Sequence, residues 1–143
     1  MINGKTAQQA YHYTKFEAET NFPLIYKFFE DIDSEKMPLV DKHIGHLKIA
    51  FMWAFYYLKN NYKYDEAIKD ILMKGGDTDT NAAIVGGLLG SCHSIKGIKI
   101  EWVEKMLSYT PEKAHDSHKQ SEFVIPAYYL PQLLEGIYIN APS

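Results

Sequence analysis

The chain has 143 residues, of which 46% are hydrophobic and 14% aromatic, and its formal net charge is −3 at pH 7. This length is sufficient for one domain with a substantial core, and the apolar content excludes a disordered chain. Slight acidity without a basic cluster argues against nucleic-acid binding. We therefore expect a single domain over residues 1–143.

The number of cysteines and the length of the apolar runs indicate where in the cell the protein is expected. The single cysteine, Cys92, excludes an intramolecular disulfide framework and fits a reducing compartment. The N-terminus has no basic-then-apolar signal pattern, so a cytoplasmic location is expected. The longest apolar run, residues 49–58, would span about 15 Å as a helix, half of the roughly 30 Å of a membrane core. A buried core helix is therefore favoured over an interfacial segment, and no membrane contact is expected.

Helix formers and breakers predict an all-α chain without a convincing strand pair. Thr6, Asn21 and Asp41 are candidate helix caps, Pro23 suits a first helical turn, and Gly75-Gly76 marks a helix end. The helices are expected over residues 6–19, 23–29, 41–60, 64–74, 79–92, 100–109 and 126–138, with polar loops over 31–38 and 111–122.

The helix expected over residues 41–60 is apolar on most sides, which predicts that it lies inside the fold. One face is formed by residues three or four positions apart, and a second face is also apolar. The first face contains Ile44, Leu47, Phe51, Phe55 and Leu58, and the second contains Met52, Trp53 and Tyr56.

The most informative segment is the turn Gly75-Gly76-Asp77-Thr78-Asp79-Thr80, which precedes a helix rich in small residues. Crowded carboxylate and hydroxyl oxygens suit a hard divalent cation such as Mg²⁺ or Mn²⁺. Carboxylates are also favoured at a helix start when no metal ion is bound, so Asp77 or Asp79 can be an N-cap. Spacing alone leaves a metal site and an elaborate cap equally open.

Three glycines lie inside the helix that follows this turn, at positions 86, 87 and 90. Each interior glycine costs roughly 1 kcal/mol relative to alanine, or about 3 kcal/mol together. Close backbone packing against a neighbouring helix would offset that cost and hold the turn rigid.

The segment GGDTDTNAAIVGGLLG, residues 75–90, resembles the C-terminal metal motif of the ADP-ribosylglycohydrolases. The Asp-x-Asp-Thr core, the preceding glycines and the Ala/Gly-rich helix all agree. The order of the flanking features along the chain also resembles that of the family. These features are Ile44-Gly45 before a long helix, the run Tyr64 to Ile68, and Trp102 downstream of the motif. The resemblance is strongest over residues 40–110, with weaker support to residue 135.

The resemblance implies an all-α fold around a site with two Mg²⁺ or Mn²⁺ ions. Members of the family hydrolyse the glycosidic bond between ADP-ribose and a protein side chain or a small acceptor. Asp77, Asp79 and Thr80 match the metal ligands, Asp79 would bridge both ions, and Thr78 would not be a ligand. The expected ligand is therefore ADP-ribose or an ADP-ribosylated substrate.

The acidic cluster of the first half of the family is not found in this sequence, so no catalytic residue is assigned. The nearest acidic group, residues 30–35, lacks a Thr-Asp-Asp core and is expected to be a solvated loop. The chain is thus expected to correspond to a C-terminal half whose site is completed by an N-terminal chain or by self-association. The alternative is a non-catalytic helical module, or a fragment, that binds ADP-ribose or a partner protein.

Overall fold

The computed structural model describes residues 6–42 and 45–108, and every regular element in these ranges is helical. The helices are α1 (Ala7–Asn21), α2 (Pro23–Asp33), α3 (Leu47–Lys59), α4 (Tyr64–Met73), α5 (Thr78–His93), the short 3₁₀ helix η2 (Ile95–Gly97) and α6 (Ile100–Leu107). The predicted all-α class is confirmed. No helix within these ranges combines the length and apolar character needed to cross a membrane.

The chain divides into two compact units, residues 1–98 and residues 99–143. The first unit contains α1 to α5 and η2, and the described part of the second contains α6. The loop and helix predicted over residues 111–122 and 126–138 lie outside the described residues. A single domain over the whole chain remains a prediction.

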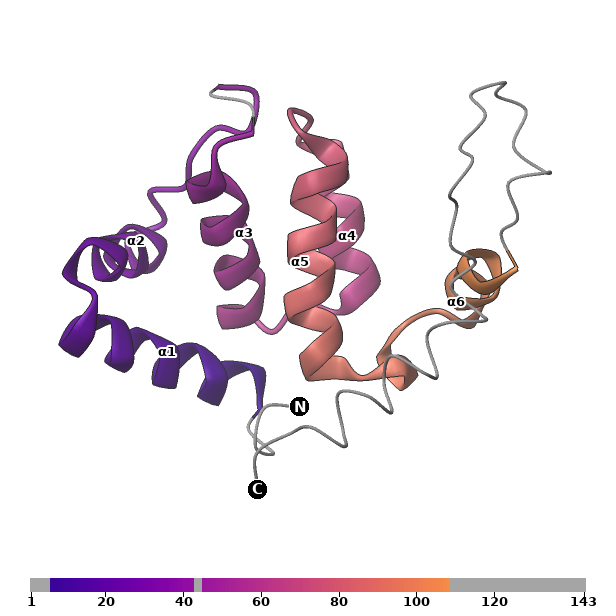
Figure 1. Ribbon diagram of the computed structural model, residues 1–143, viewed down its shortest axis with the longest axis horizontal. Coiled ribbons are helices and arrows are strands. Elements are labelled where there is room, and N and C mark those ends of the chain that lie inside the picture. The colour runs from indigo at the N-terminus through magenta and orange to yellow at the C-terminus, as the bar shows by residue number, and fades with distance from the viewer. Residues whose placement is uncertain (1–5, 43–44, 109–143) are drawn as a thin grey trace, which may run out of the picture. The chain divides into compact units, whose positions relative to one another are not determined.

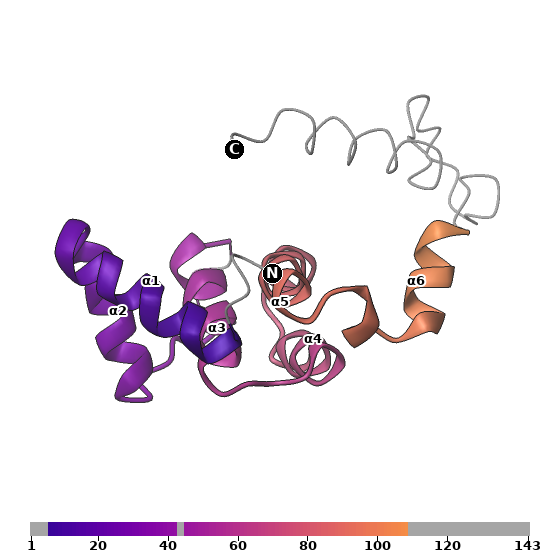
Figure 2. The ribbon, with the colours of Figure 1, turned by 90° about the horizontal axis from the view of Figure 1, so that it is seen from below.

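Helix α3 is the centre of the first unit (Figure 1). Helices α1 and α2 pack against each other and against α3, while α5 packs against both α3 and α4. The view from below shows α3, α4 and α5 as neighbouring helices (Figure 2). The segment leading into α3 and the first turn of α5 lie at the same end of this unit (Figure 1).

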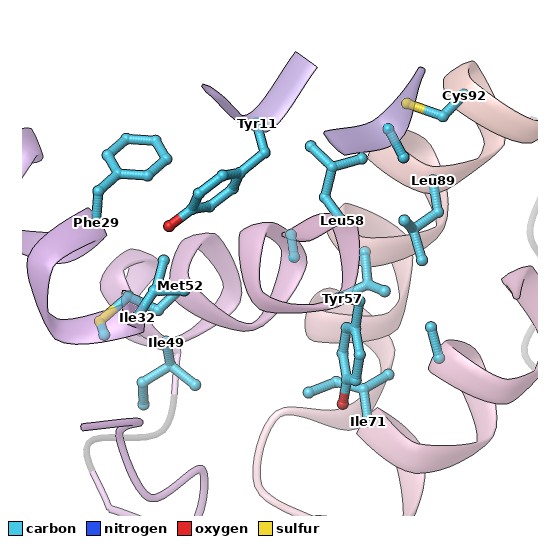
Figure 3. Packing of buried hydrophobic residues seen from close by; sticks show 14 of the residues in the cluster. Tyr11, Phe29, Ile32, Ile49, Met52, Tyr57, Leu58, Ile71, Leu89 and Cys92 are labelled. Atoms are coloured by element: carbon cyan, nitrogen blue, oxygen red, sulfur yellow. The ribbon is translucent and has the colours of Figure 1, made fainter. Parts of the chain in front are cut away.

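Aromatic side chains join α1 and α2 to α3. The ring of Phe29 is completely buried and contacts Tyr11 and Phe55 edge-on, with ring centroids 5.4 and 5.0 Å away. Edge-to-face pairs of this kind add about 0.5–1.5 kcal/mol beyond the burial of their area. Figure 3 shows how the core continues from this cluster towards α4 and α5. The largest fully buried side chains are Tyr11, Tyr57, Phe29, Ile32, Met52, Leu58, Ile71, Leu89 and Val85.

The expected helix ends are confirmed at two places. Thr6 caps α1 through a capping box, in which its hydroxyl accepts from the Gln9 N–H and the Gln9 side chain accepts from the Thr6 N–H. Gly75 and Gly76 follow α4 in the left-handed region, with φ of +80° and +72°. The cap expected at Asn21 is wrong: Asn21 ends α1, and Phe22 precedes Pro23 at the start of α2.

Two predicted helix boundaries are also wrong. The loop expected from residue 31 begins later, because α2 continues to Asp33 and buries Ile32. Helix α3 begins at Leu47 rather than near Asp41, because Gly45 adopts φ of +79° and interrupts any helix there. Leu47 is 72% exposed and therefore does not join the inward face predicted for it.

The buried character predicted for the body of α3 is confirmed. Its fully enclosed residues are Ile49, Ala50, Met52, Ala54, Tyr57 and Leu58. They lie on several sides of the helix, because α1 and α2 cover part of α3 while α5 covers another part.

Two of the three glycines in α5 mark a close approach to α4. A Cβ at Gly86 would lie 3.0 Å from the Tyr64 hydroxyl oxygen and 3.3 Å from Ile68 Cδ1, and a Cβ at Gly90 would lie 3.6 Å from the Tyr64 ring. The predicted close packing is therefore confirmed at Gly86, whereas the distance at Gly90 is an ordinary van der Waals contact. Gly87 is exposed, and a Cβ there would meet no atom within 4 Å.

The substitutions Gly86→Ala and Gly87→Ala separate helix propensity from this packing. Gly87→Ala should stabilise the chain by roughly 1 kcal/mol, because alanine favours the helix and meets open space. Gly86→Ala gains the same propensity but crowds Tyr64, so it should be about 1–3 kcal/mol less stable than Gly87→Ala. Urea unfolding of the two variants measures the difference, and equal stability would show that the α4–α5 contact is loose.

A polar cluster around Asp33 connects α1, α2 and α3. The Asp33 carboxylate accepts from the Tyr11 hydroxyl at 2.8 Å and pairs with the ammonium groups of Lys15 and Lys59. Partial burial alone would raise the pKa of Asp33, but hydrogen bonds from Lys15, Lys59 and Tyr11 outweigh it and lower the pKa to about 2. The ionised carboxylate therefore stabilises the end of α2 that the sequence pattern predicted as loop.

The Asp33 cluster predicts an acid-sensitive contribution to stability. The pKa is lower in the folded chain than in the unfolded one, so this contribution is complete above about pH 4 and is lost as the pH falls towards 2. Asp33→Asn should lower the free energy of unfolding by about 1 kcal/mol at pH 7 and flatten its pH dependence in that window. Asp31→Asn is the control, since among the described residues Asp31 makes one exposed ion pair, 3.7 Å from Lys48. Equal effects of both substitutions would contradict the assignment.

Candidate functional site

The three predicted metal ligands lie together at the start of α5. The Gly75-Gly76 turn reverses the chain after α4 and places Asp77 at the N-cap position of α5, with Asp79 and Thr80 in the first helical turn. Asp77 is half-buried, whereas Asp79 and Thr80 are exposed to solvent. The structure thus brings Asp77, Asp79 and Thr80 onto one helix end, as their spacing predicts.

The side chain of Asp77 does not cap the helix. Its backbone carbonyl accepts from the Asn81 N–H at 3.0 Å, but its carboxyl group makes no capping hydrogen bond. The Asp77 side chain, followed by the backbone N–H groups of Thr80 and Asp79, lowers the pKa of the Asp79 carboxyl. A simple cap therefore does not explain the Asp77 side chain.

The segment before α3 supports the turn from the other side. The Val40 side chain is buried in the core, and a Cβ at Gly76 would lie only 2.1 Å from the Val40 carbonyl oxygen. No residue with a side chain fits between these backbones. Gly45 also approaches the site, since a Cβ there would lie 3.6 Å from Asp77 Oδ2.

Side chains from α3 and α4 hold this segment and the end of α4 in place. The Trp53 indole N–H donates to the Pro38 carbonyl at 3.1 Å, and the Lys74 ammonium lies 4.2 Å from the centroid of the Trp53 ring. Lys74 also pairs with Asp70 at 3.2 Å, and the Tyr57 hydroxyl donates to the same carboxylate at 2.7 Å. Lys74 directly precedes the glycine pair, so these contacts fix where the turn begins.

Burial and the hydrogen bond to Asp70 raise the pKa of Tyr57. Its phenol therefore stays protonated and remains a donor throughout the ordinary pH range. The contact between α3 and the last turn of α4 does not depend on pH near neutrality.

The donor atoms of the turn fit Mg²⁺ or Mn²⁺ in type but not in number. Carboxylate and hydroxyl oxygens are hard ligands. Within residues 6–42 and 45–108, however, no group of three His, Cys, Asp or Glu side chains is arranged to hold a metal ion. Additional ligands would have to come from outside these residues.

Asn81 is a further candidate that the sequence interpretation left without a role. It is the one polar residue classed as buried in the described part of the chain, with 4% exposure, and it directly follows Thr80. The available signal was its position inside the motif, since asparagine is seldom buried in a helix without a specific reason. Asn81 is thus a buried residue next in sequence to the proposed ligand Thr80.

The substitutions Gly76→Ala and Gly75→Ala test how the turn is held. Both residues have positive φ, so each substitution should cost about 1–2 kcal/mol for the left-handed backbone. Gly76→Ala should cost about 2 kcal/mol more, because its Cβ would collide with the Val40 carbonyl, whereas Gly75 has no atom within 4 Å of its Cβ position. Unfolding in urea provides the comparison. Similar losses in the free energy of unfolding for both variants would mean that the close approach of Val40 and Gly76 does not constrain the residue at position 76.

Comparison with known proteins agrees with the motif. The model of the ADP-ribosylglycohydrolase family matches residues 16–124, which extends the resemblance beyond residues 40–110 in both directions. A protein of Acanthamoeba polyphaga mimivirus, provisionally described as an ADP-ribosyl glycohydrolase, is 27% identical over 143 residues. That alignment covers 91% of this chain but only 43% of the viral protein. No solved structure matches the chain. Because the family match covers most of the chain, this protein belongs to the ADP-ribosylglycohydrolase family.

Proposed function

We propose that the turn from Asp77 to Thr80 supplies metal ligands to a centre that hydrolyses the glycosidic bond of ADP-ribose. The substrate would be ADP-ribose joined to a protein side chain or a small acceptor. The observation that carries the proposal is the gathering of Asp77, Asp79 and Thr80 at the start of α5. Asp77 occupies the N-cap position, yet its carboxyl group makes no capping hydrogen bond.

The roles of the proposed ligands follow from the resemblance to the family motif, which implies that Asp79 would contact both cations and that Asp77 and Thr80 would be further ligands. Asp79 and Thr80 are exposed, so their oxygens are accessible to an ion. When bound, a pair of Mg²⁺ or Mn²⁺ ions orients substrate oxygens and lowers the pKa of a bound water. The contacts of Val40 with Gly76 and of Trp53 with Pro38 keep the ligands in place before substrate arrives.

Three side chains are not enough for this centre. Two octahedral cations need roughly twelve ligand positions, some of them filled by water. The chain spans less than half the length of its viral relative, which agrees with a site that another polypeptide segment completes. We propose that this segment carries the acidic residues that these 143 residues lack.

A second candidate function is a helical module that binds ADP-ribose or a partner protein without hydrolysing a bond. The observation that favours it is the shortage of ligands around Asp77 and Asp79 in the described part of the molecule. The two candidates differ in whether bound ADP-ribose is ever released from its acceptor.

Hydrolysis is tested by mixing the full chain with the N-terminal acidic half of an ADP-ribosylglycohydrolase and an ADP-ribosylated protein. With Mg²⁺ present, the mixture should release free ADP-ribose. Asp79→Asn should reduce that release roughly 100-fold, because it removes a charged metal ligand. Glu66→Gln, which changes an exposed carboxylate on α4, is the matched control.

The outcomes separate the two candidate functions. Release that depends on Asp79 and on Mg²⁺ supports the hydrolase. Binding of ADP-ribose without release from any mixture supports the non-catalytic module. If neither binding nor release of ADP-ribose is observed, both candidate functions are overturned.

A further inference from the structure

Trp53 on α3 contacts both backbone segments that meet at the metal turn, residues 77–80. Its indole N–H donates to the Pro38 carbonyl at 3.1 Å, and the Lys74 ammonium lies 4.2 Å from the centroid of its ring. Pro38 lies in the segment before α3, whereas Lys74 directly precedes the glycine pair that leads into the turn. One side chain thus bridges the two segments whose relative position sets the geometry of the turn.

The orientation of the Trp53 ring is itself fixed by its neighbours on α3. Its centroid lies 5.3 Å from that of the Tyr56 ring and 5.7 Å from that of the Tyr57 ring, and Tyr57 is completely buried. The Tyr57 hydroxyl donates to Asp70 at 2.7 Å, so the same cluster is tied to α4. A side chain held in this way transmits the position of the core to the residues that it touches.

Lys74 is kept on the Trp53 ring by its ion pair with Asp70, at 3.2 Å. An ion pair on the surface contributes little alone, but the Lys74 side chain is only 28% exposed and its ammonium also lies over the ring. The Asp70 carboxylate is fixed in turn by the Tyr57 hydroxyl. The end of α4 is therefore attached to α3 through both the charge and the position of Lys74.

The contacts of Trp53 and the approach of Val40 to Gly76 close a ring of interactions. Pro38 is two residues before Val40, whose carbonyl oxygen leaves no space for a Cβ at Gly76, and Gly76 is two residues after Lys74. A cavity of about 460 Å³ is lined by residues 37–41, Trp53 and Lys74. Because the described side chains leave this space open, the two segments depend on Trp53 and on the Val40–Gly76 contact for their separation.

We propose that Trp53 and Lys74 are positioning residues that act as a unit to set the affinity of the metal turn for a divalent cation. Neither residue is a ligand. Trp53 fixes the segment before α3 and Lys74 fixes the end of α4, so together they hold the backbone from which Asp77 and Asp79 project. The effect on a cation rests on the proposed function, whereas the support of the turn does not.

Amide hydrogen exchange of the metal-free full chain measures this support. The reporters are the Gly75 N–H, which donates to the Leu72 carbonyl at 3.2 Å, and the Asn81 N–H, which donates to the Asp77 carbonyl at 3.0 Å. Trp53→Phe keeps a ring beside Lys74 but removes the donor to Pro38. Both reporters should then exchange roughly fivefold faster relative to a reference amide, as expected for the loss of one hydrogen bond.

The reference and the control separate local support from overall stability. The reference is the Ser94 N–H at the far end of α5, which donates to the Gly90 carbonyl at 2.9 Å. Phe29→Leu is the control, because it removes a completely buried ring between α1, α2 and α3. It should lower the free energy of unfolding without changing the ratio of reporter to reference exchange.

Substitutions of Lys74 provide a second test at a partly exposed side chain, where folding does not depend on the core. Lys74→Gln should also accelerate the reporters, and its combination with Trp53→Phe should add little, because both remove the same support. Lys74→Arg keeps the charge and stacks on an aromatic ring, so it should restore the exchange rates of the wild type.

A Mn²⁺ titration connects this support to metal binding. Trp53→Phe should weaken the binding of Mn²⁺ at residues 76–81 severalfold, while Phe29→Leu should bind Mn²⁺ as the wild type does. Equal reporter exchange in the wild type, Trp53→Phe and Lys74→Gln would overturn the positioning role.

The positioning role and the metal site fail separately in these measurements. Faster reporter exchange in the variants, with no Mn²⁺ binding by the wild type, would support the positioning of the turn and overturn the metal site. Mn²⁺ affinity that is the same in the wild type and Trp53→Phe would overturn the control of affinity by Trp53 and leave the metal site in place.

Discussion

The backbone contact between Val40 and Gly76 is the constraint on which the site depends. The Val40 side chain is buried in the core, so its carbonyl oxygen has a fixed position, and only glycine fits opposite it. The positive φ of Gly76 then directs the chain into α5. This contact joins the segment before α3 to the turn after α4, and Gly45 approaches Asp77 at the same junction.

The rest of the first unit keeps that contact in register. Helix α5 lies close to α4 because Gly86 leaves space for the Tyr64 side chain, and α3 is covered by α1, α2 and α5. Trp53 reaches from α3 to Pro38, so movement of the segment before α3 is opposed by a buried helix. A site with exposed ligands can in this way be held by a core that excludes water.

Local patterns in the sequence were sufficient to predict the ends of some helices and not of others. The helix cap at Thr6 and the glycine stop after α4 depend on neighbouring residues, and both were predicted. The start of α3 was not, because the segment before it is held by distant partners, Gly76 and Trp53. The end of α2 was missed for the same reason, since Asp33 is stabilised by side chains of α1 and α3.

The candidate site shows the same division. The proximity of Asp77, Asp79 and Thr80 follows from their spacing at a helix start. The resemblance to the family motif identifies the same three residues as the expected metal ligands. That the Asp77 carboxyl does not cap the helix depends on backbone geometry that spacing does not reveal.

The most direct measurement for the metal-binding turn is nuclear magnetic resonance of the isotope-labelled full chain during titration with Mn²⁺. The paramagnetic ion should first broaden the amide signals of residues 76–81, at the low affinity expected of an incomplete ligand set. Asp79→Asn should abolish that broadening without shifting signals from the core. Broadening centred on residues 30–35, or unchanged broadening in the Asp79→Asn variant, would contradict the assignment of this turn as a metal-binding element.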